Sequence, residues 1–152
     1  MKRILMVALI GSGPALAQDF VPAVDADQVQ ACFAQAFRDG VDTDCIGAAA
    51  GLCMEQPGGF STQGMSQCTS AETEVWDGFL NREYKARMAE ITSDQKTALR
   101  GAQRAWIAFR DADCGLQYQM FIEGTMRSNI YTGCMLDMTA RRALVLRDLG
   151  GM

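Results

Sequence analysis

The sequence predicts an all-α protein, a small antiparallel three-helix bundle stapled by disulfide bonds, with a cysteine-rich helical extension at its N-terminus. Apolar residues recur every three or four positions along three long segments, which is typical of helices that bury one face. No segment shows the two-residue alternation of a strand. The six cysteines form no Cys-x-x-Cys motif, and an even number in a short chain indicates structural disulfides.

The first seventeen residues have the pattern of a secretory signal peptide. Lys2 and Arg3 precede an apolar run over 4–10, and Ala15-Leu16-Ala17 forms an A-x-A cleavage site. A retained membrane anchor is the alternative, but the run is short for a bilayer. Gln18 follows the site in place of a cysteine, so no lipid attachment is expected there. We therefore expect a periplasmic or secreted protein with no membrane anchor after cleavage.

Composition narrows the function further. The 152 residues suffice for one ordinary domain and carry a net charge of −4. Cleavage removes two basic residues and no acidic one, which makes the charge of the mature chain −6. This balance argues against a nucleic-acid partner. Because the chain has no histidine, Ser-His-Asp and Cys-His nucleophiles and His-ligated zinc are excluded, and we expect neither a metal nor a cofactor.

The N-terminal extension is expected to be less regular than the rest. Two short helices are predicted over 28–38 and 44–54, around a turn at 40–43. The segment 56–67 contains Pro57-Gly58-Gly59 and many small polar residues, so it is predicted as a loop.

Three long helices are predicted beyond this loop. Thr69 and Glu72 have the spacing of a capping box, so the first helix is expected from Thr69 to Ile91. Thr92-Ser93-Asp94 offers the N-cap of a second helix, which Gly124 ends at the C′ position. A third helix is expected from about Met126 to Leu149. The second stripe contains Leu99, Ala102, Trp106, Phe109, Leu116 and Met120, with Asp113 as its polar member.

Cysteine spacing suggests the disulfide pairs. Cys114 and Cys134 each lie ten residues from Gly124, so a helical hairpin around that glycine brings the two sulfurs level. Cys53 and Cys68 bracket the predicted loop, and closing it is their simplest use, which leaves Cys32 to pair with Cys45. The rival arrangement, 32–53 with 45–68, is also geometrically reasonable because Cys32 and Cys53 are nearly equidistant from the turn.

Residues 99–114, LRGAQRAWIAFRDADC, resemble the hallmark helix L-R-x-A-Q-R-A-W-x-x-[FY]-R-D-x-x-C of the LprI-type lysozyme inhibitor family. Two flanking segments are also similar to that family's pattern. They contain Cys68, Glu72, Asp77, Leu80, Asn81 and Tyr84 upstream, and Cys134, Thr139, Arg142 and Leu146 downstream. The family's minimal domain keeps cysteines that match Cys53, Cys68, Cys114 and Cys134, which favours the 53–68 pair and leaves 32–45 to the extension.

The resemblance implies an organisation and a function. After the expected signal peptide (1–17), it divides the chain into a cysteine-containing helical extension (18–52), an LprI-like helical domain (53–149) and a tail (150–152). It implies an exported inhibitor that acts on a lysozyme by protein–protein contact, and the acidic charge suits a basic lysozyme. The alternative function is a non-enzymatic structural or adaptor module of the bacterial cell envelope that binds another protein or a glycan.

The motif residues have a structural and a functional interpretation. In the first, Trp76, Trp106 and Phe109 belong to the core, and Asn81 and Tyr84 bridge a helix junction. Arg110 would then form a bidentate pair with Asp77 across two helices. In the second, the partner-binding residues are Arg104, Arg110 and Asp111, with the arginines directed at an anionic groove of a partner.

An enzyme is not expected. Glu72, Glu74, Asp77 and Glu83 cluster along one predicted helix, and two carboxylates suffice for glycoside hydrolysis. Such a pair must face each other across a cleft, and a small helical bundle offers little concavity. The chain also shows no activated nucleophile, so we expect no catalytic residue.

Overall fold

The computed structural model describes residues 20–36 and 44–149 and is all-helical over these ranges. Its five helices are α1 (Ala26–Gln35), α2 (Ala48–Met54), α3 (Thr62–Glu90), α4 (Ser93–Met120) and α5 (Arg127–Asp148). The expected signal peptide and tail, and the turn at 40–43, lie outside the described residues. No helix within the described ranges is long and apolar enough to cross a membrane.

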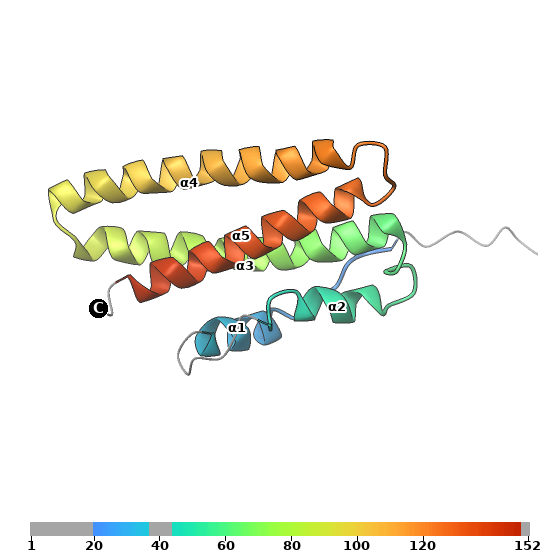
Figure 1. The fold of residues 1–152 in the computed structure, drawn as a ribbon. Helices are drawn as coiled ribbons and strands as arrows, with labels where there is room; N and C mark the ends of the chain where they lie inside the picture. The colour runs from blue at the N-terminus through green and yellow to red at the C-terminus, as the bar shows by residue number, and fades with distance from the viewer. Residues whose placement is uncertain (1–19, 37–43, 150–152) are drawn as a thin grey trace, which may run out of the picture.

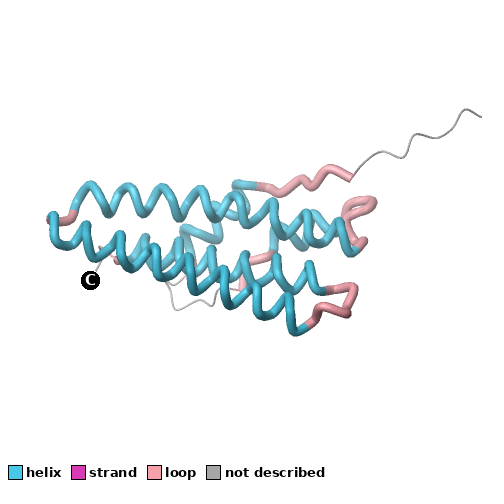
Figure 2. The backbone as a smooth tube through the Cα atoms, turned by 90° about the horizontal axis from the view of Figure 1, so that it is seen from above, coloured by secondary structure: helices cyan, strands magenta, loops and turns pink. Residues whose placement is uncertain are grey.

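The three long helices form the predicted antiparallel bundle. Helix α3 turns back into α4 through a short connection, and α5 returns between them (Figure 1). Helix α5 packs most extensively against α3 and next against α4, whereas α3 and α4 approach each other little. The short helices α1 and α2 lie on the side of the bundle away from α4 (Figure 1), and Figure 2 shows the described chain as helices joined by loops. Helices α3 and α5 therefore form the centre of the fold, and α4 is exposed along much of its length.

The start of α3 differs from the prediction. This helix begins at Thr62, because the Ser61 hydroxyl caps it by accepting a hydrogen bond from the Gly64 amide at 2.9 Å. The predicted capping box of Thr69 and Glu72 is wrong, since Thr69 lies within the helix and donates its hydroxyl to the Met65 carbonyl. The predicted loop at 56–67 is therefore a loop only in its first half.

The ends of α4 confirm one prediction and overturn another. Thr92 and Gln95 form a reciprocal capping box, in which each side chain accepts a hydrogen bond from the other residue's amide. At the other end, α4 stops at Met120 with Phe121 as its C-cap. The predicted C′ role of Gly124 is wrong, because Gly124 lies beyond the cap and is not among the described glycines with positive φ.

Three disulfides confirm the simplest pairing. Cys32 bonds Cys45, Cys53 bonds Cys68 and Cys114 bonds Cys134, with Cα–Cα separations of 5.7, 5.7 and 5.6 Å. The rival pairing of 32–53 with 45–68 is therefore wrong. The first bond joins α1 to the turn that precedes α2. The second joins α2 to α3, and the third joins α4 to α5.

The N-terminal extension and the long helices share one hydrophobic core. Val29, Cys32 and Phe33 of α1 pack in the same cluster as Trp76 of α3 and Leu144 of α5. The indole of Trp76 is fully buried, and Phe33 lies against it with ring centroids 6.1 Å apart. Burial of such side chains contributes roughly 2–3 kcal/mol each. The extension thus covers the face of α3 and α5 that α4 leaves open.

Two charged side chains fasten this extension. The carboxylate of Glu72, only 1% exposed, accepts hydrogen bonds from the amides of Gly47 (2.8 Å) and Ala50 (2.7 Å) and from the Trp76 indole (3.0 Å). An anion suits this place because the first amides of α2 point there. From α5, Arg147 donates hydrogen bonds to the carbonyls of Phe33 and Ala36 at the end of α1. Glu72 is therefore a structural carboxylate.

Candidate binding groove between α3 and α4

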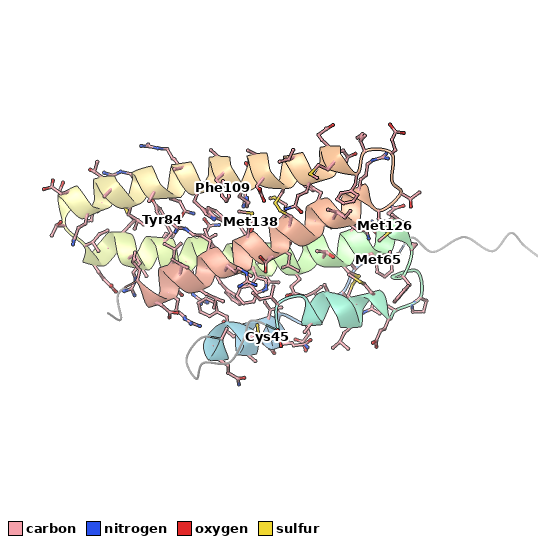
Figure 3. The ribbon with its side chains drawn as sticks, viewed as in Figure 1. Cys45, Met65, Tyr84, Phe109, Met126 and Met138 are labelled. Carbon is pink, nitrogen blue, oxygen red and sulfur yellow. A yellow bond between two sulfur atoms is a disulfide. The ribbon has the colours of Figure 1, made fainter. Side chains whose placement is uncertain are left out.

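A groove of about 410 Å³ runs between α3 and α4. It exists because α5 packs against both helices while these two stay apart. Helix α3 contributes positions one turn apart, which share one face of a helix. Helix α4 contributes the flank directed at α3, and Figure 3 shows Tyr84 between the two helices. The lining residues are Asp77, Leu80, Asn81 and Tyr84 from α3, and Arg100, Gln103, Arg104, Trp106, Ile107 and Arg110 from α4.

The predicted pair between Arg110 and Asp77 is wrong. The Arg110 guanidinium instead forms an ion pair with Asp111 at 2.8 Å and donates a hydrogen bond to the Thr139 hydroxyl at 3.4 Å. Asp77 accepts a hydrogen bond from the Asn81 amide at 2.7 Å, one turn along α3. The pair fails because the groove separates the helices, so Arg110 lies along α4 and reaches α5. Arg110 is thereby largely occupied within the chain, and its side chain is 15% exposed.

Trp106 is the centre of the contact between α4 and α5. The guanidinium groups of Arg110 and Arg142 lie 5.0 and 5.7 Å from the centre of its ring, within the range of cation–π attraction. Arg142 also donates a hydrogen bond to the side chain of Gln103 at 3.0 Å. Burial lowers the pKa of Arg142 from its ordinary value, yet an arginine remains charged at neutral pH. These residues tie α4 to α5 along the floor of the groove.

Phe109 does not belong to the core, and that prediction is wrong. Its side chain is 61% exposed. The side chains of α4 that are buried are Leu99, Gln103 and Cys114. Each residue turns the helix by about 100°, so Phe109 lies well around the helix from its neighbour Arg110. The apolar stripe of α4 is thus wider than the face that the fold buries.

Arg104 is the arginine of the groove that is most available to a partner. It is exposed at the rim of the groove and makes no hydrogen bond or ion pair with any described residue. Its neighbour Arg100 is also exposed and donates to the Thr97 hydroxyl at 3.2 Å. Asp111 is half-exposed and paired with Arg110. Of the three predicted partner-binding residues, Arg104 alone presents an uncommitted charge within the described structure.

The groove has the chemistry of a binding surface for an anionic group. Its rim is cationic, Asn81 and Tyr84 offer polar atoms, and Leu80 and Ile107 provide apolar contact. Arginine is well suited to recognise a carboxylate because its planar guanidinium can donate two parallel hydrogen bonds. Of the four carboxylates considered above for catalysis, only Asp77 lines the groove. Within the described ranges no cluster of acidic residues or cysteines could hold a metal ion.

Two functional contributions are not evident from sequence patterns. The spacing of Thr69 and Glu72 predicts a cap, whereas Glu72 lies in the interior of α3 and binds amides at the start of α2. The sequence links Thr139 and Arg142 to the site only through the family resemblance, whereas both contact the motif of α4. Thr139 and Arg142 are three residues apart and therefore lie on one face of α5. This spacing is the feature of the sequence from which their shared contact with α4 could have been predicted.

Comparison with known proteins agrees with the motifs. Residues 53–146 match the family model described as "Lysozyme inhibitor LprI". The chain is also 28% identical to an uncharacterized protein of Rhizobium meliloti (strain 1021), in an alignment that covers 59% of this chain and 73% of the relative. No solved structure matches the chain.

Proposed function

Because this chain belongs to the LprI family of lysozyme inhibitors, we propose that it binds a lysozyme outside the cytoplasm and inhibits it. The three disulfides support this location, since such bonds persist in oxidising, extracytoplasmic compartments. The proposed contact is the groove between α3 and α4, with Arg104 as its central anchor. The inhibitor acts by occupying the lysozyme and performs no chemistry of its own.

The observation that carries this proposal is the state of Arg104. It is an exposed cation within the family's hallmark motif, at the rim of the groove between α3 and α4, and no described residue pairs with it. Glycosidases of the lysozyme type work with two carboxylates in a cleft. A guanidinium that enters such a cleft would pair with these carboxylates and exclude substrate.

Charge and rigidity also favour such a complex. The mature chain is expected to carry a net charge of −6, so it attracts a basic lysozyme at long range while the cationic groove faces an acidic cleft. Three disulfides and a shared core hold the α3–α4 groove in shape before binding. A preformed surface loses less conformational entropy on association than a flexible one.

The experiment is a lysis assay. Mature protein is mixed with lysozymes of several types, and the turbidity of a bacterial cell-wall suspension is followed. We expect inhibition that saturates with protein and weakens as salt rises, because salt screens the attraction. Unimpaired lysis with every lysozyme type at micromolar protein would contradict the proposal and favour the adaptor function.

Matched variants locate the contact. Arg104→Ala is expected to lose inhibition while keeping its helical circular dichroism. Arg141→Ala is the control, since Arg141 is also an exposed helical arginine but pairs with Asp137 on α5 and does not line the groove. Equal inhibition by both variants would rule out the groove as the contact.

A further inference from the structure

Helix α4 carries an exposed apolar surface on the flank that faces away from the groove. Its members follow one another at intervals of three or four residues, as in the seam of a coiled coil. We call them the outer stripe: Ala98, Ala102, Ala105, Phe109, Ala112, Leu116 and Met120, all of them exposed. Phe109, Leu116 and Met120 are 61%, 58% and 71% exposed, respectively. The outer stripe contains no charged residue, so it is an apolar face without a partner in the described fold.

The side chains of the outer stripe are small at its N-terminal end and large at its C-terminal end. Its N-terminal half consists of alanines and borders a hollow of about 450 Å³ between α4 and α5. The hollow is lined mainly by apolar side chains, including Leu99, Leu146 and the half-exposed Val145 and Leu149. The C-terminal half carries the projecting side chains of Leu116 and Met120. One face of the molecule therefore has both a hollow and side chains that would fill it.

We propose that two copies of this chain pair through the outer stripe, with their α4 helices antiparallel about a two-fold axis at Phe109. Ala98 and Met120 each lie eleven residues from Phe109, and Ala102 and Leu116 each lie seven residues from it. The axis therefore sets Met120 of one copy over Ala98 of the other, and Leu116 over Ala102. The two large side chains of each copy enter the hollow of its mate. Such a self-complementary contact is the form that two-fold dimers use.

The size of the contact predicts its strength. The overlap from Ala98 to Met120 is about 33 Å long at 1.5 Å per residue. A helix is about 10–12 Å across and the edge of α5 widens only the N-terminal half of the overlap, so the contact measures roughly 500 Å² per copy, below the ~800 Å² of a standard stable interface. We therefore expect a dissociation constant of tens of micromolar. Because both mature copies carry net negative charge, salt should strengthen this pairing, whereas it should weaken binding to a basic lysozyme.

This inference is independent of the proposed function. The groove with Arg104 lies on the other flank of α4, so the dimer leaves both grooves open. Loss of dimerisation and loss of inhibition are therefore separate results.

Sedimentation equilibrium of the mature protein over a range of concentrations tests the pairing and its register. Ala102→Glu and Leu116→Lys should each raise the dissociation constant at least about tenfold, because each places a charge against an apolar surface. The double variant should regain dimerisation, since the axis sets each new charge against the opposite charge of the mate. Within one chain the two positions are about 21 Å apart, so the rescue cannot arise inside a monomer.

Phe60→Glu is the control. Phe60 is 76% exposed in the connection before α3, away from the outer stripe, and its replacement should leave the dissociation constant unchanged. Circular dichroism checks that each variant is folded. A wild-type protein that stays monomeric at several hundred micromolar would overturn the proposal. A double variant that dimerises no better than the single variants would also overturn it. So would a Phe60→Glu variant whose dissociation constant rises as much as those of the single variants in the outer stripe.

Discussion

Replacing Glu72 tests how the N-terminal extension is held to the bundle. Its buried carboxylate accepts three hydrogen bonds, two of them from backbone amides at the start of α2. Hydrogen bonds to a charged group contribute about 1.5–3 kcal/mol each, and a buried donor left without a partner costs about 1–3 kcal/mol. We expect Glu72→Ala to lower the free energy of unfolding by about 3–5 kcal/mol. Glu72→Gln should lower the free energy of unfolding by about 2–3 kcal/mol. Its NH₂ group is a donor and would face a backbone N–H, which is also a donor and bonds to a carboxylate oxygen in the native protein.

The assay is urea unfolding with the disulfides intact, together with thermal unfolding. At about 4 °C per kcal/mol for a domain of this size, Glu72→Gln should lower the melting temperature by roughly 8–12 °C. In amide hydrogen exchange, the backbone amides of α2 should be the first to lose protection. Glu74→Gln is the control, because Glu74 is exposed two residues further along α3 and should change stability by less than about 0.5 kcal/mol. A loss below about 1 kcal/mol for Glu72→Ala would show that this carboxylate does not hold α2 to the bundle.

The remaining predictions concern the hairpin of α4 and α5. At protein concentrations where the chain is monomeric, Trp106→Ala should cost about 2–4 kcal/mol in urea unfolding, whereas Phe109→Ala, at a position exposed in the monomer, should cost less than about 0.5 kcal/mol; similar losses would contradict the packing described. Replacing Cys114 and Cys134 together by serine should remove about 3 kcal/mol, since the bond closes a loop of some twenty residues, and an unchanged midpoint would contradict this estimate. Thiol titration of the unfolded, unreduced protein should find no free thiol, and two or more would contradict the three described bonds.

Local patterns in the sequence were enough to predict the helical hairpin. The pattern of apolar residues marked three long helices, and the equal distance of Cys114 and Cys134 from Gly124 set their register. The N-cap of α4, Thr92, stands directly before the helix, so it too could be identified from the sequence. The start of α3 could not be identified in this way, because Pro57-Gly58-Gly59 and the hydroxyl residues that follow this segment have low helix propensity. The disulfide between α2 and α3 and the cap at Ser61 hold those first turns in place.

The site was predictable in its residues but not in its contacts. The hallmark motif contained Arg104, Trp106 and Arg110, and all three line the groove. The partner of Arg110 depends on the separation of α3 and α4, which α5 sets by packing between them, and no local pattern encodes that distance. The same holds for Phe109, because an apolar stripe does not reveal how far around the helix burial extends. Tertiary packing therefore decided which motif residues stay available to a partner.

The groove between α3 and α4 is proposed to bind a lysozyme through Arg104. Isothermal titration of the mature protein with a panel of lysozymes measures this contact, with Arg104→Ala and Arg141→Ala as the paired variants. We expect binding to at least one lysozyme, a loss of about tenfold or more in affinity for Arg104→Ala, equivalent to about 1.4 kcal/mol, and no loss for Arg141→Ala. Absence of binding to every lysozyme at tens of micromolar, or equal affinity of the two variants, would contradict this proposal.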